Sequence, residues 1–489
     1  MAGFNKVKEH RPNAVSYEGG AVYEKSPVNE WLNMLFSSFM EDKFYESALD
    51  QQQRFVELTN KMADAYGYEF VAKAAVFARN ELGMRSISQL IAAWLNNKTF
   101  KNKRQFYCAF MHRPDDVAEI FAATDYLWGK KSRSHALVRG AADYLSALKP
   151  QTLAKYKLNS RDYNMYDLIN ITHAHSKAID LYKAGELMAA DTWEVNISAK
   201  SDKAERDQEW KRMVEEHKLG YMALIRNLNN ILDNPEINQD WIRYTLVPQI
   251  TNEKAIHKSL MFPYRFYTAY KNLNVHNPFL DAALGEAFTI AAVKNAPQLD
   301  GGSAIILDVS GSMEDRISYN SNITIKEVGA CFAIALWLAN PQSPVIKFGT
   351  TAKFVTNLNL LENPFTLISR LCHNDGCGYG TNIVPAFDFL GQNSTYKNTY
   401  NRIFIISDMQ VMDNRWSYYS SDTAVKAYHS NFGMMSCYSF DLGNYHTQIL
   451  SPYDNIHYIT ALNDQVFKFI GLLESGINLV DYINQFNYC

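Results

Sequence analysis

The periodicity of apolar residues changes once along this 489-residue chain, near residue 298, and this change limits the folds that the chain can adopt. From about residue 27 to 295, apolar residues recur every three or four positions, as they do on one face of a helix. After residue 298, short continuous apolar runs alternate with stretches of helical period. We therefore predict two domains, residues 1–296 and residues 297–489, with Pro297 to Gly302 as the linker.

The first region predicts amphipathic helices joined by short connectors. We expect a helix to start at Pro27, because proline suits the first turn and Ser26 can cap it. Asn196 to Glu209 is charged and weakly patterned, and predicts a loop or an exposed helix start. Many helices without intervening strands indicate an all-α solenoid of stacked helix pairs. The clearest apolar stripes are Trp31, Met34, Leu35 and Phe39; Phe70, Ala74, Phe77 and Ala78; Val117, Ile120, Phe121, Thr124 and Trp128; and Leu280, Ala283, Leu284 and Ala287.

The second region predicts an α/β fold. Its apolar runs have the length of buried strands, and helical stretches separate them. Alternation of this kind is typical of a parallel, doubly wound sheet covered on both faces. The predicted strands are Ser303 to Asp308, Val345 to Phe348, Arg402 to Ser407 and Met434 to Phe440, and the helices between them include Ile323 to Leu338 and Val384 to Leu390.

Composition limits the possible environments and partners. Hydrophobic residues make up 47% of the chain, which is typical of a globular protein. We find no apolar stretch of membrane-spanning length and no apolar signal segment within Met1 to Glu30, so we expect a cytoplasmic protein that does not bind a membrane. The net charge of −3 means that any nucleic-acid site must be a local basic surface.

The cysteines predict neither a disulfide framework nor a strong zinc site. Six cysteines are scattered along the chain, and reduced, mostly buried thiols are the simplest interpretation. Cys372, His373 and Cys377 lie close together, but zinc would need a fourth ligand and no matching pair follows at the usual spacing.

The most specific motif is Asp308-Val-Ser310-Gly-Ser312, directly after a predicted buried strand. In a doubly wound sheet, ligands bind at the carboxyl ends of strands. The predicted ligands are Asp308, Ser310 and Ser312 on one loop, Thr381 on a second, and Asp408 at the end of a third strand. Gly311 is expected to permit a tight turn. Carboxylate and hydroxyl oxygens suit Mg²⁺ first, and Mn²⁺ or Ca²⁺ second.

These five positions resemble the metal-ion-dependent adhesion site of von Willebrand factor A domains. The resemblance implies one divalent cation with an open coordination position, which a carboxylate of a partner often completes. The metal loop lacks an obvious general base, and we find neither a nucleophile elbow nor a phosphate-binding P-loop. We therefore expect that the protein is not an enzyme.

Five further segments follow one another over nearly the whole chain: Tyr17 to Tyr23, Arg113 to Val117, Tyr166 to His173, Leu224 to Leu228 and Ile256 to Lys271. In this order they resemble segments of the Ro ribonucleoprotein (TROVE-domain) family. The resemblance implies a ring of HEAT-like helical repeats joined to a von Willebrand factor A domain, a monomer that binds small non-coding RNA. It also implies that single-stranded ends of misfolded RNA enter the ring, while structured Y RNAs bind its outer surface.

The resemblance also assigns RNA-binding residues. His173 matches a histidine of the family's RNA site, although a lone helical histidine is more often a core residue. Arg139 matches a basic position of a neighbouring helix, whereas Val138 and Asn170 stand where the family has basic residues. Lys130, Lys131 and Arg133, in an apparent insertion before that helix, can compensate, although such charge runs are usually solvated helix faces.

Two functions from different classes follow from these residues. The first is an RNA-binding scaffold of a ribonucleoprotein particle that sequesters RNA or presents it to a nuclease or another quality-control partner. The second is a metal-dependent protein-interaction module without an RNA ligand. The ordered TROVE-like segments favour the first function, and the low net basicity favours the second.

Overall fold

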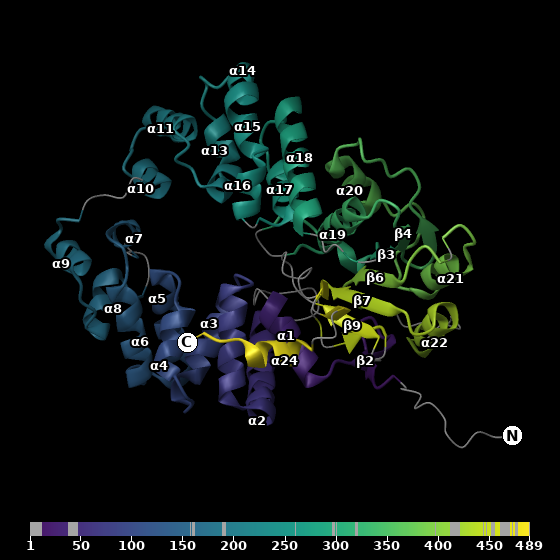
Figure 1. Ribbon diagram of the computed structural model, residues 1–489, viewed down its shortest axis with the longest axis horizontal. Helices are drawn as coiled ribbons and strands as arrows, with labels where there is room; N and C mark the ends of the chain where they lie inside the picture. Colours follow the sequence, from purple (N-terminus) through teal and green to yellow (C-terminus); the bar gives the residue numbers. More distant parts are fainter. Residues whose placement is uncertain are drawn as a thin grey trace. The chain divides into compact units, whose positions relative to one another are not determined.

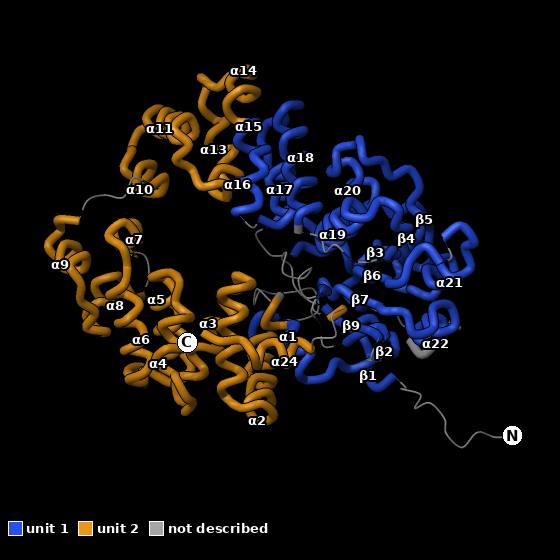
Figure 2. The backbone as a smooth tube through the Cα atoms, viewed as in Figure 1, with its two compact units in different colours: residues 1–33, 41–50, 247–471 blue, residues 34–40, 51–246, 472–489 orange. Residues whose placement is uncertain are grey.

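The computed structural model describes residues 12–488 except 38–46, 157, 159–161, 188–191, 260, 296–298, 300, 318–320, 397, 411–420, 444, 446, 451–454, 460–469, 472 and 475–477. The chain separates into two compact units (Figure 2). Unit 1 comprises residues 1–33, 41–50 and 247–471, and unit 2 comprises residues 34–40, 51–246 and 472–489. In the described part of the chain, no helix combines the length and apolarity needed to span a bilayer.

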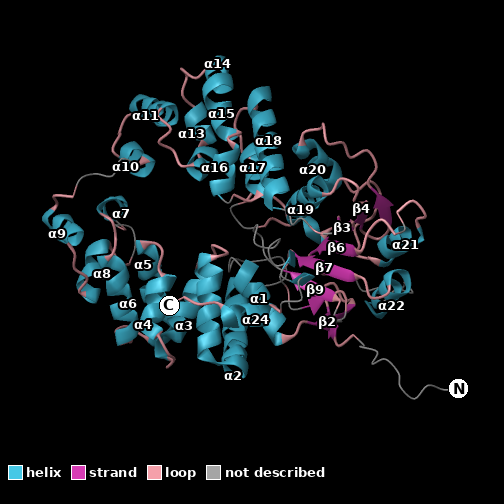
Figure 3. Cartoon of the chain, viewed as in Figure 1, coloured by secondary structure: helices cyan, strands magenta, loops and turns pink. Residues whose placement is uncertain are grey.

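Unit 2 is built from helices that pack on the helix two places further along the chain (Figures 1 and 3). In this way α3 packs on α5, α4 on α6, α6 on α8 and α7 on α9, which is the packing expected of helical repeats. The helices of this region are α2 (Ala48–Asn80), α3 (Ser86–Trp94), α4 (Lys103–Phe110), α5 (Pro114–Trp128), α6 (His135–Ser146), α7 (Pro150–Lys155), α8 (Met165–Thr172), α9 (Lys177–Ala184), α10 (Trp193–Ser198), α11 (Lys203–Glu215), α12 (Tyr221–Arg226), α13 (Leu228–Leu232) and α14 (Gln239–Trp241).

A buried carboxylate joins three of these helices. Asp116 in α5 accepts a hydrogen bond from Arg79 of α2 at 2.7 Å and one from Gln89 of α3 at 2.8 Å. The backbone N–H groups of His112 and Arg113 each donate to the same carboxylate at 3.0 Å. Burial raises the pKa of Asp116, but these donors outweigh burial and the net pKa lies below the ordinary value. The helical unit therefore satisfies its buried charge with its own side chains.

The last described helix of the chain, α24 (Leu479–Gln485), belongs to the same unit. The ring of Phe77 in α2 contacts Tyr482 and Phe486, with ring centroids 5.8 and 5.5 Å apart. Lys73 donates to the backbone oxygen of Asn484 at 2.5 Å. Residues from the end of the sequence thus complete the core around α2.

Unit 1 contains a six-stranded sheet in the order β5-β4-β3-β6-β7-β9. All neighbouring strands pair in parallel except the edge strand β5, which is antiparallel to β4. The chain runs from β3 to β4 on one side and later returns to β6 on the other side of β3, so the strand order reverses between β3 and β6. The strands are β3 (Ser303–Asp308), β4 (Val345–Phe348), β5 (Ala352–Phe354), β6 (Arg402–Ser407), β7 (Ser436–Asp441) and β9 (Ile456–Ile459).

Helices cover both faces of this sheet, as expected for a doubly wound fold (Figure 1). On one face α19 packs against β3 and β6, and a Cβ atom at Gly329 would lie 3.1 Å from both Leu307 and Ile406. On the other face α21 and α22 cover a core that includes Ile306, Ile346 and Ile405. The helices around the sheet are α19 (Ile325–Ala339), α20 (Pro364–Cys372), α21 (Val384–Gln392) and α22 (Ser421–Phe432).

Four helices before the sheet also belong to unit 1: α15 (Val247–Ile250), α16 (Glu253–Ser259), α17 (Pro263–Lys271) and α18 (Pro278–Asn295). They group with the sheet because α17 and α18 both pack on α19. The compact units therefore divide the chain differently from the predicted domains 1–296 and 297–489, which follow local periodicity and stay a prediction. Most of the predicted linker lies outside the described residues.

The N-terminal region adds a small second sheet to unit 1. Strand β1 (Ala14–Val15) pairs with β2 (Ala21–Glu24), and β2 pairs with β8 (Thr447–Gln448), both antiparallel. Helix α1 (Pro27–Ser37) starts at the predicted proline and buries Trp31 and Met34, whereas Phe39 lies outside the described residues.

Candidate functional site

Three loops at the carboxyl ends of β3, β4 and β6 form the strongest candidate site. Asp308 is the last residue of β3, and Asp408 directly follows β6. The strand order reverses between these two strands. Ligands bind at such a position in doubly wound folds. The Gly311 N–H donates to the Tyr379 oxygen at 2.9 Å, which joins the loop of Ser310 and Ser312 to the loop of Thr381. The structure therefore brings the predicted metal ligands to one end of the sheet.

Hydrogen bonds fix the orientation of the two acids. Asp308 accepts the Ser310 N–H at 2.8 Å on one carboxylate oxygen and the Ser407 hydroxyl at 2.6 Å on the other. The hydroxyl oxygens of Ser310 and Ser312 lie 3.4 Å apart. Asp408 accepts the backbone N–H of Gln410 at 3.2 Å. Ser407, which sequence analysis did not select, orients Asp308 and could have been suspected because it precedes the second acid.

The two acids carry like charges in a dry environment. Asp308 and Asp408 have at most 1% of their surface exposed. Burial raises the pKa of Asp308 to about 6, although its bonds to Ser310 and Ser407 partly offset this effect. Burial, followed by the charge of Asp308, raises the pKa of Asp408 well above its ordinary value. Among the described ion pairs, none joins a lysine or arginine to either acid, so a cation would stabilise both ionised carboxylates.

An unsatisfied hydroxyl points to the same chemistry. Thr381 is 2% exposed, and its Oγ1 makes no hydrogen bond to any residue that the structure describes. Leaving such an atom buried costs free energy unless it has a partner. Two carboxylates and three hydroxyls form a hard oxygen set, which fits Mg²⁺ or a similar divalent cation. Within the described chain, three His, Cys, Asp or Glu side chains do not gather around one point, so such a site depends on the hydroxyls as well.

The loops of this site require a glycine at Gly349 and not, as predicted, at Gly311. Gly311 has a φ of −64°, which any residue adopts, so the expected need for glycine in this turn is wrong. Gly349 is required instead, because a Cβ atom there would lie 2.2 Å from the Gly378 oxygen. This close approach lets the Asn382 N–H donate to the Gly349 oxygen at 2.8 Å and holds the Thr381 loop against β4.

Arg133, a predicted RNA-binding residue, is engaged inside unit 2. Its guanidinium pairs with Asp125 at 2.6 Å and lies over the rings of Phe121 and Tyr163, 4.7 and 5.0 Å from their centroids. Its side chain is only 11% exposed. This arrangement gives Arg133 a structural role and fits poorly with the predicted phosphate contact.

The other predicted basic residues lie on the surface. Lys130, Lys131 and Arg139 are exposed, at and shortly after the connection between α5 and α6. Val138 is half-buried and adds no charge there. Among the ion pairs between described residues, none includes these three cations.

His173 is exposed, so the alternative interpretation as a core histidine is wrong. It ends α8 with a φ of 54°, in the left-handed region, which turns the chain toward α9. Two residues further along the loop, His175 donates its backbone N–H to the hydroxyl of Ser146, the last residue of α6, at 3.2 Å. His173 therefore lies near the C-terminal end of α6, about 10 Å along the helix axis from the level of Arg139.

Further basic residues surround this turn, and sequence analysis did not select them. Lys149 immediately precedes α7, while His175 and Lys177 connect α8 to α9, and all three are exposed. Helix α7 packs on α9, and α6 packs on α8. We call Lys149, His173, His175 and Lys177 the turn patch. The available signal was the occurrence of His173, His175 and Lys177 at alternate positions between two short helices, although single charges at helix starts are common.

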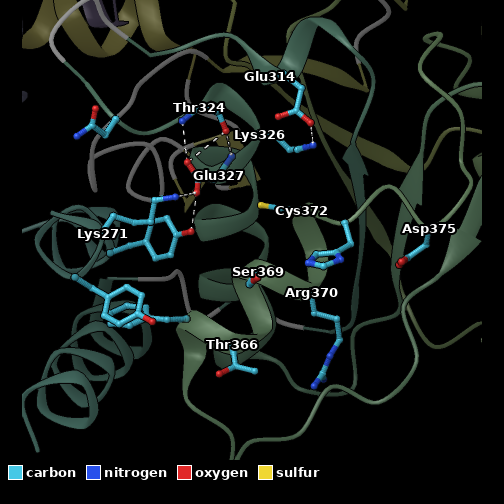
Figure 4. Close-up of a pocket in the computed structure, with 15 residues that line it drawn as sticks. Lys271, Glu314, Thr324, Lys326, Glu327, Thr366, Ser369, Arg370, Cys372 and Asp375 are labelled. Atoms are coloured by element: carbon cyan, nitrogen blue, oxygen red, sulfur yellow. Dashed lines mark hydrogen bonds and ion pairs between the residues drawn. The ribbon is translucent and has the colours of Figure 1, made fainter. Parts of the chain in front are cut away.

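A polar pocket of about 930 Å³ in unit 1 is a weaker candidate (Figure 4). Its lining includes Lys271, Lys326 and Arg370, but each has an acidic partner. Lys271 and the Tyr267 hydroxyl both donate to Glu327, at 2.8 and 2.9 Å. The pocket thus presents little uncompensated charge to a ligand.

The cysteines behave as expected from the sequence where the structure describes them. Cys108, Cys331, Cys372, Cys377 and Cys437 are free thiols, and three of the five are buried. Burial raises the pKa of the Cys372 thiol to about 12, which disfavours the thiolate that zinc requires.

In a comparison with known protein families, residues 172–278 match the model of the TROVE domain. Telomerase protein component 1 of Mus musculus is 24% identical over 297 residues, and the alignment covers 42% of this chain but only 11% of that protein. The chain thus spans about a tenth of that relative. The crystal structure of the RO (RSR) protein of Deinococcus radiodurans has a TM-score of 0.61 and 14% identity, covering 90% of this chain and 98% of the other. This likeness shows a shared fold of helical repeats and an α/β region.

Proposed function

The chain is a TROVE-domain protein related to the Ro proteins, and from this premise we propose that it binds RNA as a component of a ribonucleoprotein. The supporting observation is the turn patch, because the TROVE match begins at residue 172 and so includes His173, His175 and Lys177. Exposed cations attract phosphates without reading sequence. A near-neutral protein can bind RNA through such a local surface.

We propose small non-coding RNA with a single-stranded end as the ligand class. The exposed cations Lys130, Lys131 and Arg139 extend the basic surface of unit 2 beyond the turn patch. Y-like RNA, entry of RNA ends into a closed ring, and a role in RNA quality control are finer parts of the same proposal. His173 and His175 add ring surfaces on which unpaired bases can stack.

A salt-titrated binding assay tests the proposal. The full chain would be mixed with a structured RNA that carries a single-stranded 3′ tail, and with the same RNA without the tail. The expected result is tail-dependent binding that weakens with salt. Lys149→Ala with Lys177→Ala should reduce the slope of log K against log salt by about 0.7 for each lost contact with a single strand.

A matched control separates local contacts from net charge. Lys61→Ala with Lys101→Ala removes two exposed lysines from α2 and from the turn before α4, and should leave the slope unchanged. Single variants His173→Ala and Arg139→Ala then report which end of α6 contacts the RNA. Absence of binding at low salt, or equal losses in the test and control variants, would contradict the proposal.

We also propose that the α/β part of unit 1 is a von Willebrand factor A-like domain that binds one divalent cation, most favourably Mg²⁺. Asp308, Ser310, Ser312, Thr381 and Asp408 would hold the ion, and the buried Thr381 hydroxyl without a hydrogen-bond partner among described residues supports this. The ion would attract oxygen ligands and perform no reaction, in a protein that is not an enzyme.

The same site favours a second candidate function, a metal-dependent grip on an acidic residue of a protein partner such as a nuclease. This function would hold with or without an RNA ligand. Binding of a partner that requires Mg²⁺ and persists when RNA is removed would favour it over RNA binding.

A further inference from the structure

The polar pocket of unit 1 lies between α17, α20 and the start of α19 (Figure 4). Its volume of about 930 Å³ is at the upper end of the range that small-molecule sites occupy. Its lining residues belong neither to the five predicted metal ligands nor to the turn patch. The pocket is therefore a separate place at which a ligand can be sought.

The ionic side chains of the lining are already paired, which limits the charge of a ligand. An anion or a cation would have to displace one member of a pair, and it would then meet the like charge of that member, which is unfavourable. The pairing therefore favours a ligand without net charge. The pairs are Lys271 with Glu327, Lys326 with Glu314, Arg370 with Glu362 and Asp375 with Lys347.

One wall of the pocket is aromatic. The half-buried ring of Tyr270 lies 4.6 Å from the buried ring of Phe365, measured between centroids, with 30° between the two planes. The ring of His276 lies 4.9 Å from Tyr270 in an edge-to-face arrangement. These contacts hold the Tyr270 ring in one orientation. A fixed ring that lines a pocket offers a surface on which a planar ligand can stack.

Helix α20 adds neutral hydrogen-bonding groups to the lining. Thr366 and Ser369 are three residues apart, so they lie on the same side of the helix, and both are exposed (Figure 4). Neither hydroxyl forms a hydrogen bond with a residue that the structure describes. An apolar ligand would remove these hydroxyls from water without replacing their hydrogen bonds. The ligand should therefore be polar as well as uncharged.

We propose that this pocket binds a nucleoside, either free or as part of an unpaired nucleotide. A nucleobase is planar, uncharged at neutral pH, and carries hydrogen-bond donors and acceptors on its edges. It can stack on Tyr270 while its edge or the ribose hydroxyls bond to Thr366 and Ser369. A phosphate group would remain outside the paired charges. The proposal does not depend on RNA binding through the turn patch, because free nucleosides are sufficient to test it.

Binding of free nucleosides to the full chain tests the proposal. Adenosine, guanosine, cytidine and uridine would be titrated by calorimetry and by ligand-observed nuclear magnetic resonance. We expect Tyr270→Ala to weaken the best of them by about tenfold or more, because the stacking surface is lost. Ser369→Ala should weaken it by about threefold. Tyr270→Phe keeps the ring and should bind as wild type does, which separates lost stacking from a folding defect.

Two control variants remove similar groups elsewhere in unit 1. Phe389→Ala removes an exposed ring, and Ser394→Ala removes an exposed hydroxyl, both outside the pocket lining. Neither should change nucleoside affinity. Absence of binding by wild type at millimolar nucleoside, or equal losses in Tyr270→Ala and Phe389→Ala, would overturn the proposal. The salt dependence expected of the turn patch would be unaffected by that result.

Two further ligands define the chemistry and its source. Adenosine monophosphate should bind more weakly than adenosine, and tighter binding of the monophosphate would overturn the assignment of an uncharged ligand. An RNA with a single-stranded tail should displace adenosine from the pocket if an unpaired nucleotide is the source. A nucleoside that binds through Tyr270 but is not displaced by this RNA would support the pocket with a free nucleoside as its ligand.

Discussion

Two regions of the molecule bury carboxylates and compensate them in opposite ways. In unit 2, Asp116 receives an arginine, a glutamine and two backbone donors, and its pKa lies below the ordinary value. In unit 1, Asp308 and Asp408 receive mainly hydroxyl and backbone donors, and their pKa values are raised. The difference teaches that Asp116 has a cationic partner within the chain, whereas Asp308 and Asp408 pair with no lysine or arginine among the described residues, as the proposed metal site requires.

The largest effect on the free energy of unfolding should come from removing Arg79, the cationic partner of Asp116. Arg79→Met leaves Asp116 buried without its charged partner, which typically costs about 3–5 kcal/mol. The change would appear as a lower urea midpoint in the unfolding of the helical unit, followed by circular dichroism. Adding Asp116→Asn should recover part of the loss, and no recovery would show that packing rather than charge dominates.

Removing the metal should give the next largest effect. At a concentration one hundred times the dissociation constant, Mg²⁺ would stabilise the folded chain by about 2.7 kcal/mol. Differential scanning calorimetry in Mg²⁺ and in EDTA should show this gain in wild type and in the exposed control Asp64→Asn. Asp408→Asn should abolish it. A gain that survives in Asp408→Asn would place the ion elsewhere.

Acidification should separate the two types of carboxylate further. The pKa of Asp116 is lowered by folding, so its contribution to stability is present above the ordinary Asp value, about 3.8, and is lost as the pH falls through the lower folded pKa. The stability difference between wild type and Asp116→Asn should be constant from pH 7 to about pH 4.5 and shrink below that, by at most about 1.4 kcal/mol per pH unit. A difference that already shrinks near pH 6 would contradict the lowered pKa.

The smallest effect should come from an ion pair at the surface. Arg104 contacts Asp143 at 2.6 Å, but the two side chains are 49% and 38% exposed, so water screens the pair. Arg104→Met should leave the urea midpoint unchanged within error. A loss comparable to that of Arg79→Met would mean that burial does not decide the strength of these pairs.

The strands that carry the site were the most predictable part of the fold. The ranges predicted for β3, β4 and β6 match those of the structure, because fully buried strands read as continuous apolar runs between polar loops. Strand β7 begins two residues later than predicted, at Ser436. Because strand ends determine where loops converge, the grouping of Asp308, Ser310, Ser312, Thr381 and Asp408 could also be predicted.

Other elements depend on contacts that local sequence does not encode. The weakly patterned segment Asn196 to Glu209 is partly helical in α10 and α11, and these helices contact each other through Trp193 and Trp210, whose ring centroids are 5.5 Å apart. The placement of the N-terminal strand β2 depends on its pairing with β8, more than 400 residues later in the chain. The sequence predicts a surface charge at Arg133, because it does not show that the rings of Phe121 and Tyr163 pack against this guanidinium.

The packing of α24 against α2 has a consequence for the order in which the protein folds. The hydrogen bond between Lys73 and Asn484 joins residues 411 positions apart, and Lys25 pairs with Asp441 over 416 positions. Such long closures slow folding, and each needs a segment that the ribosome makes late. Unit 1 should therefore remain incomplete until Asp441 has been synthesised, and unit 2 until Asn484 has been synthesised.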